Sequence, residues 1–200
     1  MRVLVACEFS GKVRDAFIAK GHNAISCDLL EAEGINRKKH YKGDVFDLLS
    51  DGFDLMVAFP PCTYLSSSGL HWNKRVEGRS IKTEKALDFV RKLLSADIPK
   101  VALENPIGCI SSRIRKPDQI IQPYNFGEDA SKRTCLWLKN LPKLISTIFY
   151  PPRITKEGKE RWGNQTDSGQ NKLPPSDTRA KERSTTYQGI ASAMADQWSN

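Results

Sequence analysis

The stretch FDLMVAFPPC at residues 53–62 decides the fold class of this chain. Its apolar run stops at two prolines, Pro60 and Pro61. A short apolar run that ends at proline predicts a buried β-strand, because proline has no backbone N–H to donate to a neighbouring strand. Cys62 follows directly, so we expect its thiol to lie at the edge of a sheet.

Similar apolar runs on both sides of this strand alternate with helical patterns. Apolar residues recur at helical spacing in residues 11–22, 81–96 and 187–198. Strands that alternate with helices predict an α/β fold with a doubly wound, mainly parallel sheet. The other predicted strands cover residues 2–6, 23–28, 41–44, 100–105 and 134–138.

The length of 200 residues fits one domain at 1–200, since single cores commonly hold roughly 100–200 residues. Residues 63–80 have the composition of a long polar loop. Proline, glycine, asparagine and charged residues gather further on and predict a loop-rich insertion at about 143–183. The predicted C-terminal helix follows at about 187–198.

Composition and charge argue against a membrane protein and a metalloprotein. The chain is 39% hydrophobic and 27% charged, and no apolar run approaches the ~18–20 residues that span a bilayer. We therefore expect no membrane segment and a cytoplasmic location. Five cysteines without a C-x-x-C pair, and only three histidines, predict reduced thiols and no metal site. The formal net charge of +8 favours a polyanionic partner.

Polar residues follow the first two predicted strands, where ligands of open α/β sheets bind. Residues 8–11, Glu-Phe-Ser-Gly, form a turn into a helix, and the glycine allows a ligand to approach the backbone. Asp28 ends the second strand about twenty residues later, the spacing at which an acid accepts hydrogen bonds from a ribose. A helix cap or a surface carboxylate is an equally good interpretation of Asp28 alone.

The fourth and fifth strands end in groups suited to chemistry. Cys62 is a candidate nucleophile, although an isolated cysteine is more often a buried apolar residue. The prolines before it and the polar segment after it favour exposure. Glu104 and Asn105 end the next strand, and partial burial there raises a carboxyl pKa toward the range useful for proton donation.

The order of these motifs resembles that of the cytosine-C5 DNA methyltransferases and spans nearly the whole chain. The similarity is closest to short phage-borne members, which share a P-P-C-T-Y-L stretch and a terminal S-G-Q-N-x-L-P-P segment, here Ser168 to Pro175. The fold implied is the Rossmann-like sheet of S-adenosylmethionine (SAM)-dependent methyltransferases. The matching residues are the Phe9-Ser10-Gly11 turn, Asp28, Gly43-Asp44-Val45, Pro61-Cys62, Glu104-Asn105-Pro106, Phe126-Gly127, Lys132-Arg133-Thr134 and Gly189.

The resemblance implies a reaction and a catalytic role for each matching residue. The Cys62 thiolate would add to C6 of a cytosine, and C5 would then accept a methyl group from SAM. Glu104 would hold and protonate N3 of the base, so that charge is neutralised as it develops. Asn105 would orient the loop or the base, and Lys132 would complete the catalytic set.

The resemblance also implies the binding residues and DNA as the partner, in a bacterial host cell with a gene of phage type. Residues 63–80 resemble the mobile loop that closes over DNA after base flipping. The insertion is too short for a large target-recognition domain, which predicts weak sequence-specific recognition. SAM would contact Glu8, Phe9, Ser10, Gly11, Asp28, Asp44 and Pro60; DNA would contact Lys74, Arg75, Arg79, Arg133, Arg179, Lys181 and Arg183.

The sequence is also compatible with other interpretations. The first motif reads C-E-F-S-G where the family has F-x-G-x-G, and Ile190 stands where the family has asparagine after the last motif's glycine. These changes are compatible with an inactive binding protein on the same fold. A C5-modifying enzyme that acts on a free nucleotide, or with another one-carbon donor, is a second alternative. Phe59 and Cys62 flank the prolines, which argues against an amino-methyltransferase. We expect a monomer.

Overall fold

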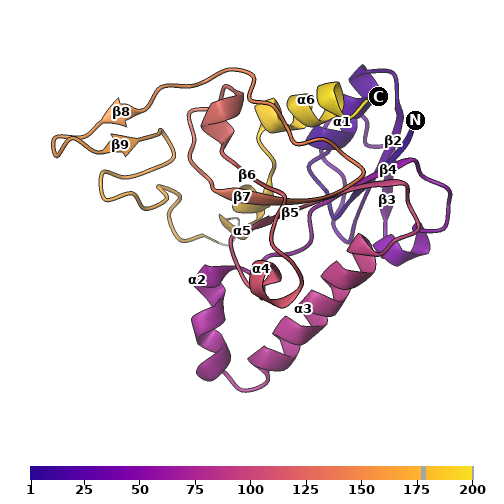
Figure 1. Cartoon of the computed structure of the whole chain (residues 1–200), viewed down its shortest axis with the longest axis horizontal. Helices are drawn as coiled ribbons and strands as arrows, with labels where there is room; N and C mark the ends of the chain where they lie inside the picture. The colour runs from indigo at the N-terminus through magenta and orange to yellow at the C-terminus, as the bar shows by residue number, and fades with distance from the viewer. Residues whose placement is uncertain (177–178, 200) are drawn as a thin grey trace.

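A computed structural model describes residues 1–176 and 179–199. Within these residues, no helix has the length and apolar content that crossing a bilayer requires. A seven-stranded sheet forms the centre of the molecule (Figure 1), with the order β3-β2-β1-β4-β5-β7-β6. The strands are β1 (Arg2–Ala6), β2 (Asn23–Asp28), β3 (His40–Lys42), β4 (Leu55–Ala58), β5 (Lys100–Pro106), β6 (Gln119–Ile121) and β7 (Thr134–Lys139).

The first five strands of this sheet pair in parallel. Strand β7 inserts antiparallel between β5 and β6. The predicted α/β class with a mainly parallel sheet is therefore confirmed. The longer helices are α1 (Lys12–Ala19), α3 (Arg79–Leu94) and α6 (Gln188–Gln197).

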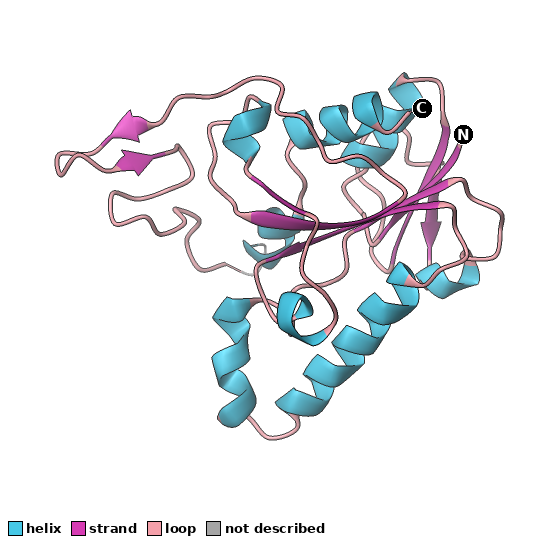
Figure 2. Ribbon diagram, in the orientation of Figure 1, coloured by secondary structure: helices cyan, strands magenta, loops and turns pink. Residues whose placement is uncertain are grey.

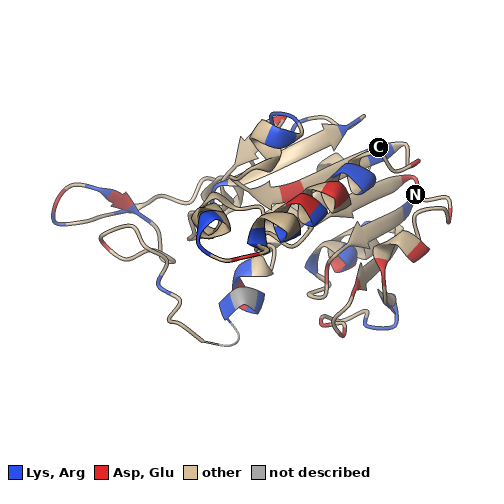
Figure 3. Cartoon of the chain, turned by 90° about the horizontal axis from the view of Figure 1, so that it is seen from below, with Lys and Arg blue, Asp and Glu red and all other residues tan. Residues whose placement is uncertain are grey.

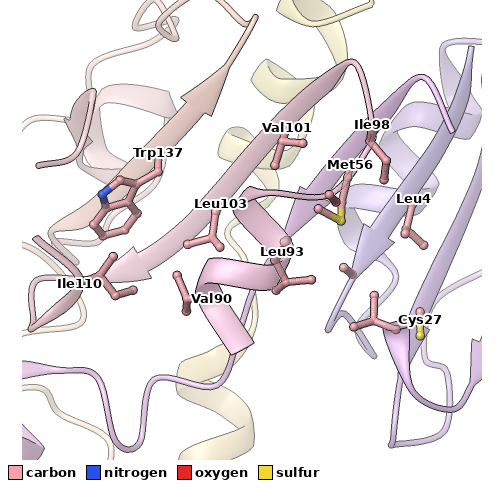
Figure 4. Packing of buried hydrophobic residues seen from close by; sticks show 14 of the residues in the cluster. Leu4, Cys27, Met56, Val90, Leu93, Ile98, Val101, Leu103, Ile110 and Trp137 are labelled. Carbon is pink, nitrogen blue, oxygen red and sulfur yellow. The ribbon is translucent and has the colours of Figure 1, made fainter. Parts of the chain in front are cut away.

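Helices cover both faces of the sheet (Figure 2), as a doubly wound fold requires. Side chains alternate along a strand, so Leu4 and Ala6 of β1 join the core beneath α3. Val3 and Val5 join the opposite core with residues of α1 and α6. Figure 4 shows Val90 and Leu93 of α3 packed toward Leu103, Val101 and Met56 on the sheet.

The sheet has one point where the direction of winding reverses. The chain moves outward from β1 through β2 and β3, then returns to place β4 on the other side of β1. After β1 the chain enters α1 on one face of the sheet, and after β4 it enters α3 on the other, so the carboxyl ends of these strands mark the usual ligand position in open α/β sheets. The tips of these two strands carry Cys7 and the Pro60-Pro61-Cys62 segment.

The segment after Cys62 differs from the polar loop predicted for residues 63–80. It forms α2 (Ser67–Leu70) and η2 (His71–Lys74) before α3 begins. Asn73 Nδ2 donates to Thr83 Oγ1 at 2.9 Å, and Thr83 Oγ1 donates to the Tyr64 carbonyl at 3.2 Å. These tertiary hydrogen bonds stabilise a helical turn that lacks apolar periodicity, so the sequence pattern did not indicate it.

The last third of the chain holds short elements joined by long connections. A hairpin of β8 (Arg153–Ile154) and β9 (Glu160–Arg161) extends away from the sheet (Figure 1), at the place of the predicted insertion. Trp162 anchors its base by stacking on Tyr124, with ring centroids 4.0 Å apart and an interplanar angle of 9°. The remaining elements are η1 (Val45–Asp47), α4 (Ile110–Arg113), η3 (Pro123–Phe126) and α5 (Arg179–Ser184).

Candidate active site

A cavity of about 470 Å³ lies beside the strand tips at the switch point. Cys7 after β1, Asp28 at the end of β2 and Pro60 after β4 contribute to its wall. Asp44 lines the cavity from the loop after β3, and Phe89 lines it from α3. Three of the residues predicted for the cofactor, Asp28, Asp44 and Pro60, therefore come together in one cavity.

Asp28 and Asp44 each use one carboxylate oxygen to shape their own loop. Asp28 Oδ1 accepts the Leu30 N–H at 2.9 Å, and Asp44 Oδ1 accepts the Phe46 N–H at 3.0 Å, capping η1. The Oδ2 atoms have no hydrogen-bond partner among residues 1–176 and 179–199. Two acceptors thus remain for a ligand with hydroxyl or amine donors.

The predicted turn residues Glu8, Phe9, Ser10 and Gly11 do not line this cavity. Glu8 is buried, and its Oε1 and Oε2 accept the N–H groups of Val13 at 2.7 Å and Arg14 at 3.2 Å. Burial raises the pKa of the Glu8 carboxyl, while these hydrogen bonds lower it. Glu8 therefore caps the N-terminus of α1.

Arg14 fills the space beneath the turn, which sequence reasoning did not foresee. Its fully buried guanidinium donates to Ser26 Oγ at 2.9 Å and to the Glu33 carbonyl at 2.9 Å. A Cβ on Gly11 would lie 2.1 Å from Arg14 Nη2, and Gly11 has a φ of 75°. The glycine leaves room for the arginine and for the turn, and both features fix the tip of β1.

Further cavity residues were also missed by the sequence prediction. Cys7 has a φ of 58°, uncommon for a residue other than glycine. Burial first, and then Asp28, Cys27 and Asp44, raise the pKa of Cys7 to about 12, so its thiol stays protonated. The position of Cys7 directly after a buried strand could have indicated that it lines the cavity. Tyr64, Lys82 and Lys85 complete this side of the wall.

Cys62 lies on a loop whose backbone is held from two sides. Its carbonyl oxygen accepts the N–H groups of Leu65 at 3.0 Å and Ser66 at 2.9 Å. Asn105 at the tip of β5 is buried, and its Nδ2 donates to the Pro60 carbonyl at 2.7 Å. The partly exposed Cys62 therefore has a defined position between the tips of β4 and β5.

Cys62, Glu104 and Lys132 are electrostatically coupled. Burial first, and then the Glu104 carboxyl, raise the pKa of the Cys62 thiol, while Lys132 and Arg183 lower it. Burial also raises the pKa of Glu104, against the opposing effects of Lys132 and a Thr134 hydrogen bond. In the free protein, the structure therefore favours a neutral thiol beside a carboxyl that protonates readily.

A second, more polar pocket of about 280 Å³ lies next to this group. Lys132 and Arg133 from the loop before β7, and Pro106 at the end of β5, form one side. Arg183 lines it from α5, the short helix beside the grey trace in Figure 3. Lys132 Nζ donates to the Arg183 carbonyl at 2.9 Å, so α5 is joined to the loop before β7.

The residues predicted to bind DNA fall into two groups with different surroundings. Lys74 and Arg75 lie at the end of η2 with exposed side chains. Arg79 donates to the Thr63 carbonyl at 3.0 Å and lies 4.8 Å from the Tyr64 ring centroid. The guanidinium of Arg79 therefore helps hold the loop that follows Cys62.

The second group lies on α5. Lys181 forms an ion pair with Glu33 at 2.5 Å and lies 5.0 Å from the Phe9 ring centroid. Arg179 Nε is buried without a hydrogen-bond partner in the described part of the chain. Arg183 is exposed. Arg183 is also the member of this group that lines the 280 Å³ pocket.

The described residues contain no group of three or more His, Cys, Asp or Glu side chains that could hold a metal ion. All five cysteines are free thiols. The groups at the site are the Cys62 thiol, the Glu104 carboxyl and the nearby cations Lys132 and Arg183.

Comparisons with known proteins find distant structural similarities. The sequence matches no described protein family, and no curated protein is similar to it in sequence. One solved structure, a proposed DNA modification methyltransferase encoded within a prophage of E. coli, is similar with a TM-score of 0.49 and 12% sequence identity. The match covers 76% of this chain and 52% of the other, so this chain spans about half the length of that protein. A match at this level identifies neither a family nor an activity.

Proposed function

We propose that this protein is a SAM-dependent DNA methyltransferase that modifies carbon 5 of cytosine through a covalent Cys62 adduct. The observation that carries the proposal is a juxtaposition at the carboxyl end of the sheet. A cavity with two carboxylates lies at the switch point, and Cys62, Glu104 and Lys132 are coupled at the neighbouring tips. The order of sequence motifs supports the same reaction.

The cavity residues fit an adenosine group. Val45, Ala86 and Phe89 provide apolar surface for a planar base, and Asp28 and Asp44 provide acceptors for its hydroxyl and amine donors. We propose that SAM binds here, where it supplies an electrophilic methyl group. The turn at 8–11 would support the site indirectly, since the Glu8 carboxylate is used by α1.

The proposed mechanism starts from the protonated Glu104 that the site favours and requires the Cys62 thiol to lose its proton when the base binds. Glu104, with its raised pKa, donates a proton to N3 of the base while Cys62 Sγ forms a bond to C6. Once Glu104 is hydrogen-bonded as a neutral acid, its repulsion of the thiolate falls. Lys132 and Arg183 then favour the thiolate, and the thiol proton passes to water. After methylation, the C5 proton passes to water, the Cys62 thiolate departs and N3 returns its proton to Glu104, which restores the aromatic ring and the acid.

Asn105 has a positioning role in this scheme. Its hydrogen bond to the Pro60 carbonyl ties the tip of β5, which carries Glu104, to the loop that carries Cys62. The acid and the nucleophile would therefore keep a fixed separation when the base enters.

Label transfer from SAM tests the proposal directly. Radiolabelled SAM is incubated with duplex DNA, single-stranded DNA, RNA or free nucleotides, and the labelled base is identified by chromatography. We expect label on carbon 5 of cytosine in DNA with the wild type and none with Cys62→Ala. Absence of labelled cytosine in all four pools would refute the methyltransferase proposal, and label in the nucleotide pool alone would favour the free-nucleotide enzyme.

A trapping experiment separates chemistry from binding. DNA that contains 5-fluorocytosine should form a denaturation-resistant adduct with the wild type, because fluorine at C5 cannot leave as a proton. Cys109→Ala is a matched control, since Cys109 is buried at the start of α4. If the adduct still forms with Cys62→Ala, a residue other than Cys62 is the nucleophile.

One observation favours an alternative, namely a binding protein without transferase activity. The turn at 8–11 satisfies its own polar groups and presents none of its side chains to the cavity. Binding of SAM without any label transfer is the result expected for this alternative.

A further inference from the structure

Side chains bind all four backbone polar groups of Ser131 and Lys132. Asn164 Oδ1 accepts the Ser131 N–H at 2.9 Å, and Asn164 Nδ2 donates to the Ser131 carbonyl at 3.0 Å. Gln122 Oε1 accepts the Lys132 N–H at 2.9 Å, and Thr134 Oγ1 donates to the Lys132 carbonyl at 3.1 Å. The backbone of this loop, which has no repetitive structure, is thus fully hydrogen-bonded at these two residues.

Asn164 reaches this loop from the distant insertion, 33 residues along the chain. The stacked Trp162 fixes the start of the connection, and the Gly163 N–H donates to Asp129 Oδ1 at 2.6 Å. The Asn164 carbonyl also accepts the Lys172 N–H at 2.9 Å. The backbone at Asn164 is therefore anchored on both sides, and this directs its side chain to Ser131.

We infer that Asn164 is a positioning residue, which holds the loop before β7 so that the Lys132 ammonium stays beside Cys62 and Glu104. Its importance for catalysis rests on the proposed function, but the positioning itself does not. The Lys132 ammonium is also restrained by its hydrogen bond to the Arg183 carbonyl. Loss of Asn164 would release the backbone on one side of Lys132 and let the ammonium drift toward solvent.

Electrostatics indicates what such a drift would change. Lys132 is the first group that lowers the pKa of the Cys62 thiol, and it also lowers the pKa of Glu104. Displacement of its charge should therefore make the thiolate of Cys62 harder to form. The reactivity of that one thiol reports the position of Lys132 without SAM, DNA or turnover.

The experiment measures the rate of iodoacetamide modification at Cys62 as a function of pH, by mass spectrometry of the peptide that contains it. We expect Asn164→Ala to move the midpoint of the curve of modification rate against pH to higher pH. At a fixed pH below the midpoint, modification of Cys62 should be slower by roughly 3–10-fold, which corresponds to about half to one pKa unit. Lys132→Ala should shift the profile in the same direction. The double variant should match Lys132→Ala alone, because Asn164 acts through Lys132.

Asn171→Ala is the matched control. Asn171 lines the same 280 Å³ pocket, but within residues 1–176 and 179–199 its Oδ1 accepts only the Leu173 N–H of its own turn. Its profile should coincide with that of the wild type. If Asn164→Ala does not fold, as judged by circular dichroism, Asn164→Gln replaces it, because the longer amide keeps both hydrogen-bonding groups and displaces Ser131.

A wild-type profile in the folded Asn164 variant, or additive shifts in the double variant, would overturn the inference. These outcomes are distinct from failure of the proposed function. If the pH profile of Cys62 modification shifts in a protein that transfers no methyl group, the positioning role of Asn164 is supported and the methyltransferase proposal is refuted.

Discussion

The amide nitrogen of Asn105 donates a hydrogen bond of 2.7 Å to the carbonyl oxygen of Pro60. This contact joins two neighbouring strand tips and fixes the start of the loop that carries Cys62. Asn105 Oδ1 is buried and has no hydrogen-bond partner among residues 1–176 and 179–199. The amide therefore depends on the Pro60 contact for its orientation.

Replacement of Asn105 should lower the stability of the fold and the reactivity of Cys62. Asn105→Ala leaves the Pro60 carbonyl unpaired, and we expect the free energy of unfolding in urea to fall by about 1–3 kcal/mol. Asn125→Ala is the control, because the Asn125 side chain forms no hydrogen bond in the described part of the chain; its effect should stay within about 0.5 kcal/mol. Equal effects in the two variants would show that the Pro60 contact adds nothing to stability.

Asp28 and Asp44 should affect SAM binding more than DNA binding. Each offers a carboxylate to the 470 Å³ cavity, so Asp28→Ala and Asp44→Ala should raise the dissociation constant for SAM in calorimetry and leave DNA affinity nearly unchanged. Asp44→Ala also removes the cap of η1 and should cost about 0.5–2 kcal/mol of stability. Parallel losses of SAM and DNA binding would assign purely structural roles to both residues.

The raised pKa of Glu104 predicts a pH-dependent effect of Glu104→Gln. Between the ordinary value of 4.5 and the raised value in the folded state, the unfolded chain loses its proton first. Glu104 therefore contributes no penalty below pH 4.5, and its penalty to stability grows as pH rises toward the folded pKa. Glu104→Gln removes that penalty, so its gain in stability over the wild type should be larger at pH 8 than at pH 4.

Urea unfolding of both proteins at the two pH values measures this difference. Glu104→Gln should lose methyl transfer while it gains stability at pH 8, because glutamine cannot donate the proton that N3 of the base requires. A stability difference that is the same at both pH values would place the pKa of Glu104 near its ordinary value.

DNA affinity should depend more on salt than on sequence. The short insertion offers few side chains for base edges, so phosphate contacts should dominate. The slope of log affinity against log salt should fall by about 0.7–0.9 for each lost phosphate contact, and we expect this for Arg75→Ala and Arg183→Ala. Titration of a labelled oligonucleotide at several salt concentrations measures the slope.

Arg79→Ala should act differently from these two variants. The Arg79 guanidinium already contacts Thr63 and Tyr64, so its loss should lower stability and change the salt slope less. Strong discrimination among unrelated DNA sequences, or a flat salt dependence in the wild type, would contradict binding through phosphates.

The sequence by itself determined the central strands and the candidate residues at their tips. The apolar runs at 2–6 and 53–59 have few alternatives to a buried strand, because a parallel sheet covered on both faces requires continuous apolar side chains. Residues directly after such strands must lie at the ligand edge. Asp28, Cys62 and Glu104 could therefore be placed at that edge without coordinates.

Only the tertiary structure decided which side chains line the cavity and which contacts hold the loop before β7. Glu8 turns back to cap α1 because buried amide groups at a helix start need an acceptor, and Arg14 takes the space beneath Gly11. The contact between Asn164 and Ser131 depends on the path of a connection that has no periodic pattern. Hydrogen bonds across such separations depend on loop geometry and long-range packing, and local sequence carries no signal of either.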